Sequence, residues 1–320
     1  REGERGREEG EGEGEGGVAL TAEGQKKLSE CGVGDDVKGR FVLLWPRRVK
    51  GGALYFWLAD DSGRMRARYN GNLSPQNGTV VEVAGKVVDV WGSLWVEVAH
   101  MTVPAQQVDT QQFIRKGHFD IGETEQQFRR LVESVSGVLR RLLNSFFEDR
   151  SFWEAFRRAP AAKSVHQAYE GGLLLHTVGV ARLCRAACDV YPRLQQDLLL
   201  TGALLHDVGK VWEYELFPRL DKTDAGRLVG HVVLGAQEVS RRARQLGVPP
   251  NTRLLLEHLI LSHHGRKEWG SPVEPAFAEA ELLHYADMID SRVAIYFETG
   301  GSGWRYNDAL QRYIMVGEGK

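Results

Sequence analysis

His206 and Asp207 stand next to each other at the end of an apolar segment. The run from Leu198 to Val208 is apolar nearly all round, which predicts a buried helix that Gly209 ends in a left-handed conformation. A carboxylate in the last turn of such a helix meets the negative end of the helix dipole, so Asp207 needs a cation nearby. Lys210 could supply that cation, but the adjacent imidazole favours a metal ion. The simpler alternative is a capping histidine and an Asp–Lys surface pair.

Further histidines and aspartates strengthen the interpretation as a metal site. They lie at the ends or on the faces of separate predicted helices, at His176, His231, His263, His264 and Asp287, with Asp290 and Ser291 one turn beyond. Any one of these histidines alone would more often be a core or capping residue, whereas an array on separate helices seldom arises by chance. Neutral imidazole together with carboxylate suits Mn, Fe, Co, Ni or Zn rather than Ca or Mg alone.

The elements that must position these side chains are helical. From Thr124 onward, apolar residues recur at helical spacing and prolines mark the breaks. The pattern predicts helices at Thr124–Ala159, Leu173–Tyr191, Gln195–Val208, His231–Leu246, Thr252–His264 and Ala276–Phe297. A polar, Gln-rich linker at 106–123 precedes them. The second half of the chain is therefore expected to be an all-α domain over 124–316.

The first half of the chain has a hydrophobic period of two. Its alternation and turn residues predict strands at Val37–Trp45, Ala53–Ala59, Arg64–Tyr69, Thr79–Val90 and Leu94–Val103. Five short strands within about seventy residues suit a small Greek-key barrel of the OB type, expected over 35–105. The whole chain is thus predicted to be a multidomain α+β protein, with a five-stranded barrel followed by helices.

One face of the predicted barrel carries aromatic residues interleaved with arginines. The alternation places Leu54, Phe56, Leu58, Met65, Ala67 and Tyr69 in the barrel interior. Tyr55 and Trp57 then face outward beside Arg66 and Arg68. This is the face on which OB-folds bind oligonucleotides, because bases stack on rings and phosphates meet guanidinium groups. The alternatives are a packing face against the second domain, or ordinary cross-strand pairs.

Composition excludes several other classes of protein. The 320 residues are 42% hydrophobic and 26% charged with a net charge of −2, which is ordinary for a soluble globular protein. There is neither an apolar run of about 18 residues nor a signal-peptide pattern, so no membrane partner is expected. Cys31, Cys184 and Cys188 are odd in number and indicate reduced thiols of a cytoplasmic protein. Residues 1–20 form an Arg/Glu/Gly-rich tail that is expected to be disordered.

Motifs in the helical half resemble a known enzyme family. The order of His176, His206-Asp207 and Asp287 is similar to that of the HD-domain superfamily of metal-dependent phosphohydrolases. Longer segments resemble YhaM-type 3′–5′ exoribonucleases, which join an N-terminal OB-fold to an HD domain, at Ala161–His166, Tyr169–Leu173, Leu261–Gly265, Glu268–Pro272 and Leu283–Asp287. One departure is Gln167, where the family often has a second histidine after His166.

The resemblance implies a centre of two metal ions. One ion would be held by His176, His206, Asp207 and Asp287, and the other by His231, His263 and His264, with Asp207 bridging. Whether both His263 and His264 coordinate stays open, because adjacent helical residues diverge by about 100°. The expected ion is Mn²⁺, with Co²⁺, Fe²⁺ and Ni²⁺ as alternatives.

The resemblance also implies how these residues would act. Two divalent ions would lower the pKa of a shared water molecule and supply hydroxide for attack on phosphorus. Lys210 would donate to the phosphoryl oxygens as charge develops, and its alternative is a solvent-exposed lysine. Lys163, His166 and Tyr169 are implied to hold the 3′ end of an RNA.

The sequence therefore predicts a metal-dependent 3′–5′ exoribonuclease. Its barrel would tether single-stranded RNA, with single-stranded DNA as an alternative, while the HD domain removes nucleotides. A second hypothesis is an HD phosphohydrolase of small nucleotides with a regulatory barrel. A third is a nucleic-acid-binding module whose metal is structural. Association of the chain with itself stays open.

Overall fold

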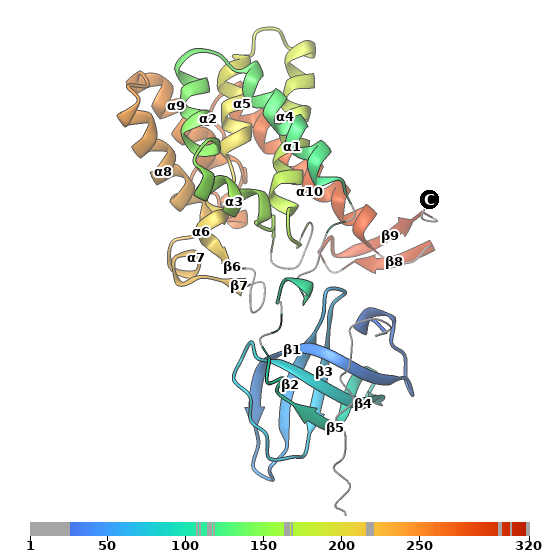
Figure 1. Cartoon of the computed structure of the whole chain (residues 1–320). Helices are drawn as coiled ribbons and strands as arrows, with labels where there is room; N and C mark the ends of the chain where they lie inside the picture. Colours follow the sequence, from blue (N-terminus) through green and yellow to red (C-terminus); the bar gives the residue numbers. More distant parts are fainter. Residues whose placement is uncertain are drawn as a thin grey trace, which may run out of the picture.

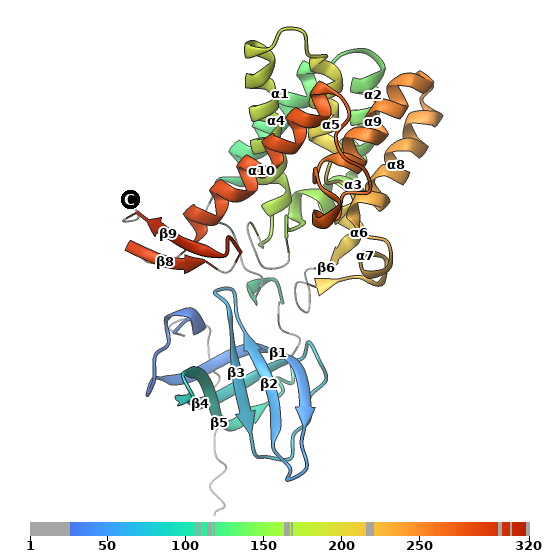
Figure 2. The same cartoon turned by 180° about the vertical axis from the view of Figure 1, so that it is seen from behind.

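The computed structural model describes residues 26–106, 108, 110–113, 117, 119–162, 167, 169–215, 221–299, 303–307 and 309–317 of the 320. A strand-built part is followed by a helical part, as Figures 1 and 2 show from two sides. The predicted fold class is confirmed. The predictions for the tail at 1–20 and for the side chains of Lys163 and His166 lie outside the described residues.

The strands close into a single barrel. They are β1 (Asp36–Arg48), β2 (Leu54–Ala59), β3 (Arg64–Tyr69), β4 (Val80–Val90) and β5 (Ser93–Thr102). The order around the barrel is β1-β2-β3-β5-β4, with β3 and β5 parallel and the other pairs antiparallel. This five-stranded closed arrangement is the predicted OB type. A short 3₁₀ turn, η1 (Leu28–Glu30), precedes it, and Leu28 packs into its core.

Alternation along the strands sorts the barrel side chains as the sequence predicts. Leu54, Phe56 and Leu58 of β2 are buried, as are Met65 and Ala67 of β3. The intervening residues of the two strands are partly or fully exposed. Side chains of successive strand residues point to opposite faces, so burial of one face determines which residues of the strand face outward.

The helical part begins after a second 3₁₀ turn, η2 (Thr110–Phe113). Its larger helices are α1 (Ile121–Ser134), α2 (Gly137–Phe147), α3 (Arg150–Arg158), α4 (Gly172–Val190), α5 (Gln196–Leu205), α8 (His231–Gln245), α9 (Pro250–Ser262) and α10 (Ala278–Glu298). Short elements lie between them, α6 (Lys210–Glu213), α7 (Asp224–Leu228) and η3 (Lys267–Trp269). In the described residues, no helix combines the length and the apolar character needed to cross a membrane.

The single helix predicted over Thr124–Ala159 is wrong, because three helices occupy this stretch. Gly137 at the start of α2 has a φ of 60°, which separates α2 from α1. Asp149 then caps α3, since its side chain accepts hydrogen bonds from the backbone N–H groups of Ser151 and Phe152. An aspartate cap inside a long apolar pattern is a helix start that periodicity alone does not reveal.

Two small hairpins accompany the helices. They pair β6 (Tyr214–Glu215) with β7 (Asp221–Lys222), and β8 (Gly303–Asn307) with β9 (Arg312–Val316). The prediction of an all-α second part therefore holds for its core but omits these strands. Figure 1 shows β8 and β9 at the end of the long helix α10, beside the chain's C-terminal segment.

The core of the helical part brings distant helices together. Helix α4 packs against α1, α3, α5 and α10, while α9 packs against α5, α8 and α10. Large apolar side chains fill the spaces between them, including Phe128, Phe146, Phe156, Leu173 and Leu199. Residues from α4, α5, α8, α9 and α10 therefore meet in one region, which is where the predicted ligands lie.

Candidate metal centre and nucleic-acid surface

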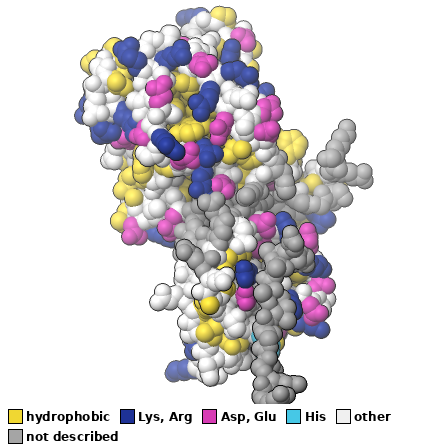
Figure 3. Space-filling model, in the orientation of Figure 1, with side chains coloured by type: hydrophobic (Ala, Val, Ile, Leu, Met, Phe, Trp, Pro, Cys, Tyr) yellow, Lys and Arg dark blue, Asp and Glu magenta, His cyan; other side chains and the backbone are white. Residues whose placement is uncertain are grey.

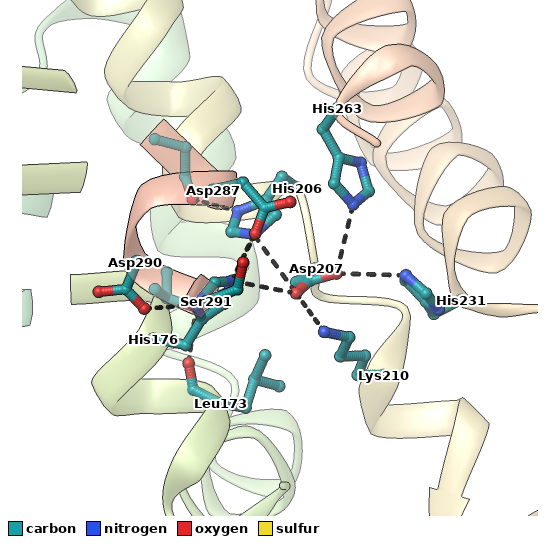
Figure 4. Close-up of polar contacts among 12 residues, drawn as sticks. Leu173, His176, His206, Asp207, Lys210, His231, His263, Asp287, Asp290 and Ser291 are labelled. Atoms are coloured by element: carbon teal, nitrogen blue, oxygen red, sulfur yellow. Dashed lines mark hydrogen bonds and ion pairs between the residues drawn. The ribbon is translucent and has the colours of Figure 1, made fainter. Parts of the chain in front are cut away.

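The structure brings all seven predicted metal ligands together. They come from five places in the chain: His176 on α4, His206 and Asp207 after α5, His231 at the start of α8, His263 and His264 after α9, and Asp287 on α10. Figure 4 shows Asp207 with His176, His206, His231, His263 and Asp287 around it. Two groups of three have ligand atoms within 4.8 Å of one another, His176–His206–Asp207 and His231–His263–His264.

The turn that carries His206 and Asp207 differs from its prediction. Helix α5 ends at Leu205, and turns lead from it into α6. Gly209 has a φ of −62° and a ψ of −21°, so the predicted left-handed cap is wrong. A Cβ on Gly209 would lie 1.9 Å from the carbonyl oxygen of His231. The glycine is therefore required for close packing of this turn against α8, which brings His231 within reach of Asp207.

Gly265, just after α9, is required both by its backbone conformation and by the space around it. Its φ is 79°, a left-handed conformation that glycine adopts without strain. A side chain here would also collide with the ring of His284, since a Cβ would lie 2.3 Å from it. The turn directs His263 and His264 into the centre, and their ring centroids lie 4.3 Å apart.

Asp207 lies between the two histidine groups and is 2% exposed. Its Oδ2 is 3.5 Å from Nε2 of His176 and 3.3 Å from Nε2 of His206. Its Oδ1 is 3.4 Å from Nε2 of His231 and 3.5 Å from Nε2 of His263. Each carboxylate oxygen therefore faces a different pair of imidazole nitrogens, which is the geometry of a bridging ligand.

The other ring nitrogen of each histidine is held by an acceptor. Nδ1 contacts the carbonyl oxygen of Ala203 in His206, of Ile260 in His263 and of Trp269 in His264, at 2.7, 2.6 and 3.0 Å. Carboxylates hold the remaining two rings. An acceptor on Nδ1 keeps the proton there and leaves Nε2 as the lone-pair donor that a metal needs.

Two of these acceptors are carboxylates that the predicted ligand set did not include. Asp290 lies 2.7 Å from Nδ1 of His176, and Glu213 lies 2.7 Å from Nδ1 of His231. Glu213 is 1% exposed and also forms an ion pair with Lys222, whose Nζ lies 2.8 Å from Oε1 of Glu213. Asp290 could be inferred from its place one turn after Asp287, but nothing local in the sequence distinguishes Glu213.

Burial and nearby charges shift the pKa of His176 in the opposite direction from those of His263 and His264. Burial disfavours the imidazolium of His176, but contacts with Asp287 and Asp290 prevail and raise its pKa to about 10. In the other group, burial lowers the pKa of His263, and burial with two neighbouring histidines lowers that of His264 to about 3. His263 and His264 are therefore neutral at pH 7 and able to coordinate, whereas His176 would have to release a proton first.

The donor set fits a divalent cation. Among the described residues, Oδ1 of Asp207, Nε2 of His231 and Nε2 of His263 are buried and have no hydrogen-bond partner. Unpaired buried polar atoms cost about 1–3 kcal/mol each, and a cation placed among them would remove that cost. Imidazole nitrogen with carboxylate oxygen matches the preference of Mn, Fe, Co, Ni or Zn.

Lys210 is buried rather than solvent-exposed. Its Nζ lies 2.5 Å from Oδ2 of Asp207, and the residue is 8% exposed. Burial raises the pKa of Asp207, but Lys210 and His206 outweigh it and hold that pKa well below its usual range. The lysine therefore reaches the centre itself, at the oxygen that faces His176 and His206.

His258, His284 and Tyr169 lie outside the two groups of proposed metal ligands. His258 accepts a hydrogen bond from the backbone N–H of Ala276, and Nδ1 of His284 contacts the carbonyl of His263. Tyr169 is 8% exposed and packs against Phe119, with ring centroids 6.0 Å apart. It lines a cavity of about 990 Å³ between the barrel and the helices.

The predicted aromatic strip is present on the outer face of the barrel. Tyr55 pairs with Arg68 and Trp57 with Arg66 across β2 and β3, which lie side by side in Figure 2. The guanidinium of Arg66 lies 5.3 Å from the ring centroid of Trp57. Arg68 forms a two-contact ion pair with Glu97, at 3.2 and 2.6 Å, so part of its charge is neutralised.

Three more residues extend this strip. Arg64 lies over Trp57, Trp95 of β5 lies under Arg66, and Trp45 packs edge-on against Trp57. Trp45 has a φ of 49° at an irregularity in the β1–β2 register, which is how a bulge redirects a side chain. Trp95 follows the alternation of β5 and could have been predicted, whereas the bulge at Trp45 could not.

Comparison with known proteins identifies the family. The HD domain family matches residues 173–292, the range that holds all seven predicted ligands. The chain is 32% identical over 244 residues to the 3′–5′ exoribonuclease YhaM of Shouchella clausii strain KSM-K16, covering 74% of this chain and 76% of that protein. The chain belongs to the YhaM family. Membership in the YhaM family, together with the HD domain, confirms the predicted resemblance and the assignment as an HD-domain hydrolase.

Solved structures were also compared. The second OB-fold domain of replication protein A from Methanococcus maripaludis is 18% identical and covers 27% of this chain and 99% of that domain, with a TM-score of 0.22. Asparaginyl-tRNA synthetase from Pyrococcus horikoshii is 16% identical over 39% of this chain and 35% of that protein, with a TM-score of 0.23. The strand order of the closed barrel, β1-β2-β3-β5-β4, is what identifies it as the OB type.

Proposed function

We propose that this chain is a metal-dependent 3′–5′ exoribonuclease that hydrolyses single-stranded RNA. The observation that carries the proposal is the position of Asp207, whose two oxygens face two separate groups of histidines. Exoribonuclease activity is the activity named for the YhaM relative from Shouchella clausii. The name of that relative supports the direction of degradation and the preference for RNA. The positions of the histidines around Asp207 support the metal centre.

The proposed ligands divide into two sets that share Asp207. His176, His206 and Asp287 would complete one set, and His231, His263 and His264 the other. Divalent ions bound there would lower the pKa of water and neutralise charge on a phosphoryl group. Mn²⁺ is the proposed ion, with Co²⁺, Fe²⁺ and Ni²⁺ as alternatives, since nitrogen and oxygen donors without any thiolate suit all four.

The chain's own residues would supply the rest of the reaction. Lys210 is placed to donate to a phosphoryl oxygen as negative charge develops there, which favours the transition state over the ground state. Asp290 and Glu213 would hold His176 and His231 in the orientation that presents Nε2 to the centre. One water molecule adds to phosphorus and one P–O ester bond breaks for each nucleotide released.

The barrel would hold the RNA strand while its end is hydrolysed. The strip of Tyr55, Trp57 and Trp95 offers rings for stacking, and Arg64 and Arg66 offer charge for phosphates. On the face drawn in Figure 3, basic and acidic side chains are interspersed over the helical part. On that face the charges do not form one large basic surface, and the local strip is what supports the proposal of RNA binding.

A cavity of about 990 Å³ lies between the barrel and the helical part. It is lined by Lys27 and Asp61 from the barrel side and by Arg182 and Phe297 from the helical side. Asp290, which contacts His176, also lines it. We propose that the strand passes here, which gives Tyr169 a place along the route rather than at the metal ions.

A 5′-labelled single-stranded RNA incubated with the purified chain and Mn²⁺ tests the function. Removal of nucleotides from the 3′ end should give a ladder of labelled products that shortens with time. Immediate release of labelled mononucleotide would show the opposite polarity. Hydrolysis of free nucleotides without any shortening of RNA would favour the alternative, a phosphohydrolase of small nucleotides.

A further inference from the structure

A pair of adjoining cavities opens beside the metal centre, on the side of α10 that faces the η3 segment. The inner cavity has a volume of about 220 Å³ and is lined by two proposed ligands, His264 and Asp287, together with Trp269, His284, Met288, Ser291 and Arg292. The outer cavity, of about 670 Å³, shares Trp269, His284, Met288 and Arg292 with it and continues to Arg266 and Tyr285. The two form one groove that starts at the proposed ligands and passes over Trp269.

Trp269 is exposed but firmly held. Its side chain is 44% exposed, an unusual state for an indole beside a buried centre. Its carbonyl oxygen contacts Nδ1 of the proposed ligand His264 at 3.0 Å. Ser271, two residues later, is buried and donates to the carbonyl oxygens of Leu261 and Val273. These contacts fix the backbone of Trp269 relative to the centre, and its ring lies 5.9 Å from that of His284, centroid to centroid. Little conformational entropy would therefore be lost on stacking.

Two arginines border the groove without acidic partners. Arg266 and Arg292 are exposed, and in the part of the chain that the structure describes neither forms an ion pair with a carboxylate. The guanidinium of Arg266 lies 5.0 Å from the ring centroid of Trp269. A planar guanidinium against an indole forms a surface on which a nucleobase can stack, and Arg292 offers a cation for phosphate.

The charges along the groove decide which end holds which group. The inner cavity is lined by one arginine and one carboxylate, those of Arg292 and Asp287, and its other lining side chains include no Lys, Arg, Asp or Glu. The outer cavity is lined by three carboxylates, those of Glu268, Glu274 and Glu281. These disfavour a phosphate in the outer part, so an uncharged base fits there and the phosphate lies toward the metal centre.

We infer that this groove is the subsite for the 3′-terminal nucleotide, with its base against Trp269 and Arg266 and its phosphate between Arg292 and the metal centre. The ligand class is a ribonucleoside monophosphate, either as the terminal unit of RNA or as the released product. This inference rests on the exoribonuclease function proposed above and assigns a binding site to the nucleotide that is removed.

A paired set of substrates tests the subsite. One is a 5′-labelled oligoribonucleotide with an ordinary 3′-terminal nucleotide, and the other ends in a ribose that lacks its base. Loss of one stacking partner corresponds to about a tenfold change. The unaltered chain should therefore remove the ordinary terminus about tenfold more efficiently, in kcat/KM, than the abasic one. Trp269→Ala should lose this preference by slowing only the ordinary substrate, and Trp269→Phe should retain it.

Trp304→Ala is the matched control, because Trp304 is 68% exposed on β8 and lies outside the groove. It should leave both rates unchanged. Equal losses on both substrates in Trp269→Ala would overturn the inference, since Trp269 would then only support His264.

Equilibrium binding of adenosine monophosphate to the Mn²⁺-loaded chain, measured by calorimetry, separates this inference from the proposed function. Trp269→Ala should weaken binding about tenfold and Trp304→Ala should not. If the unaltered chain failed to shorten RNA, the exoribonuclease proposal would fall, and this binding measurement would still decide the subsite. Unchanged binding in Trp269→Ala would overturn the subsite.

Discussion

The metal centre and the barrel strip hold charged groups and side-chain rings in opposite environments. At the centre, His176, Asp207 and His263 are each at most 2% exposed, and every ring is fixed by a second contact. On the strip, Arg64 and Arg66 are exposed and contact mainly aromatic rings. Buried groups that are positioned in advance suit transition-state chemistry, whereas exposed cations and rings suit binding to many sequences. Substitutions in the two regions should therefore change different measured quantities.

The largest effect is expected from Asp207→Asn. The change weakens the one ligand that faces both histidine groups, so turnover should fall by roughly 10³-fold or more. Binding of a long RNA should stay within about threefold, because the strip is untouched. Single-turnover hydrolysis measures the turnover rate, and a titration measures the affinity for long RNA. The control variant is Asp189→Asn, an exposed change on α4. Turnover near that of the control would mean that Asp207 is not the bridge.

A smaller effect is expected from Glu213→Gln. The amide can still occupy the space but accepts a weaker hydrogen bond from His231, so metal affinity at that half should fall by about 10–100-fold. Glu215→Gln, an exposed change on the same segment, should leave affinity unchanged. Mn²⁺ titration of the chelator-treated chain measures both variants. Equal affinity in the two would show that Glu213 serves only the fold.

Replacing Tyr55 and Trp57 together by Ala should alter binding rather than turnover. Long-RNA binding should weaken by about 1–3 kcal/mol for each base that loses its stacking partner. Hydrolysis of a dinucleotide should not change, because so short a substrate does not reach the strip from the centre. A lower melting temperature with equal losses on both substrates would instead support the alternative that this face packs against the helical part.

The smallest effect concerns salt. Arg66→Ala removes a cation that stands over Trp57 and Trp95, so the slope of log binding constant against log salt should fall by about 0.7. Arg68→Ala should change the slope less, because Glu97 already pairs with Arg68. Titrations of long RNA at several salt concentrations compare the two variants. A larger change in slope for Arg68→Ala than for Arg66→Ala would mean that the RNA phosphates contact Arg68 rather than Arg66.

Sequence reasoning succeeded where one periodic pattern decides the structure. The alternation of β2 and β3 is enough to place Phe56 inside and Trp57 outside, because each strand has one buried face. It failed where the outcome depends on a neighbour far away in the chain. The sequence predicts a left-handed Gly209, whereas the structure requires a glycine there because the carbonyl of His231 on α8 leaves no room for a Cβ.

The candidate site was predictable to a similar degree. The His-Asp and His-His pairs at helix ends are visible in the sequence and made these residues candidates, and the family resemblance implied which of them are ligands. Glu213 was missed because its importance comes from a contact with His231, eighteen positions away, that only the fold creates. Trp45 was missed because a β-bulge directs it onto the strip.

The most direct test of the two-ion centre is a metal count on protein prepared without chelator. Two divalent ions per chain are predicted, because Asp207 presents one oxygen to each histidine group. His231→Ala should lower the count toward one while the group of His176 and His206 keeps its ion. A single ion in the unaltered chain, with no change in His231→Ala, would contradict the shared-carboxylate centre.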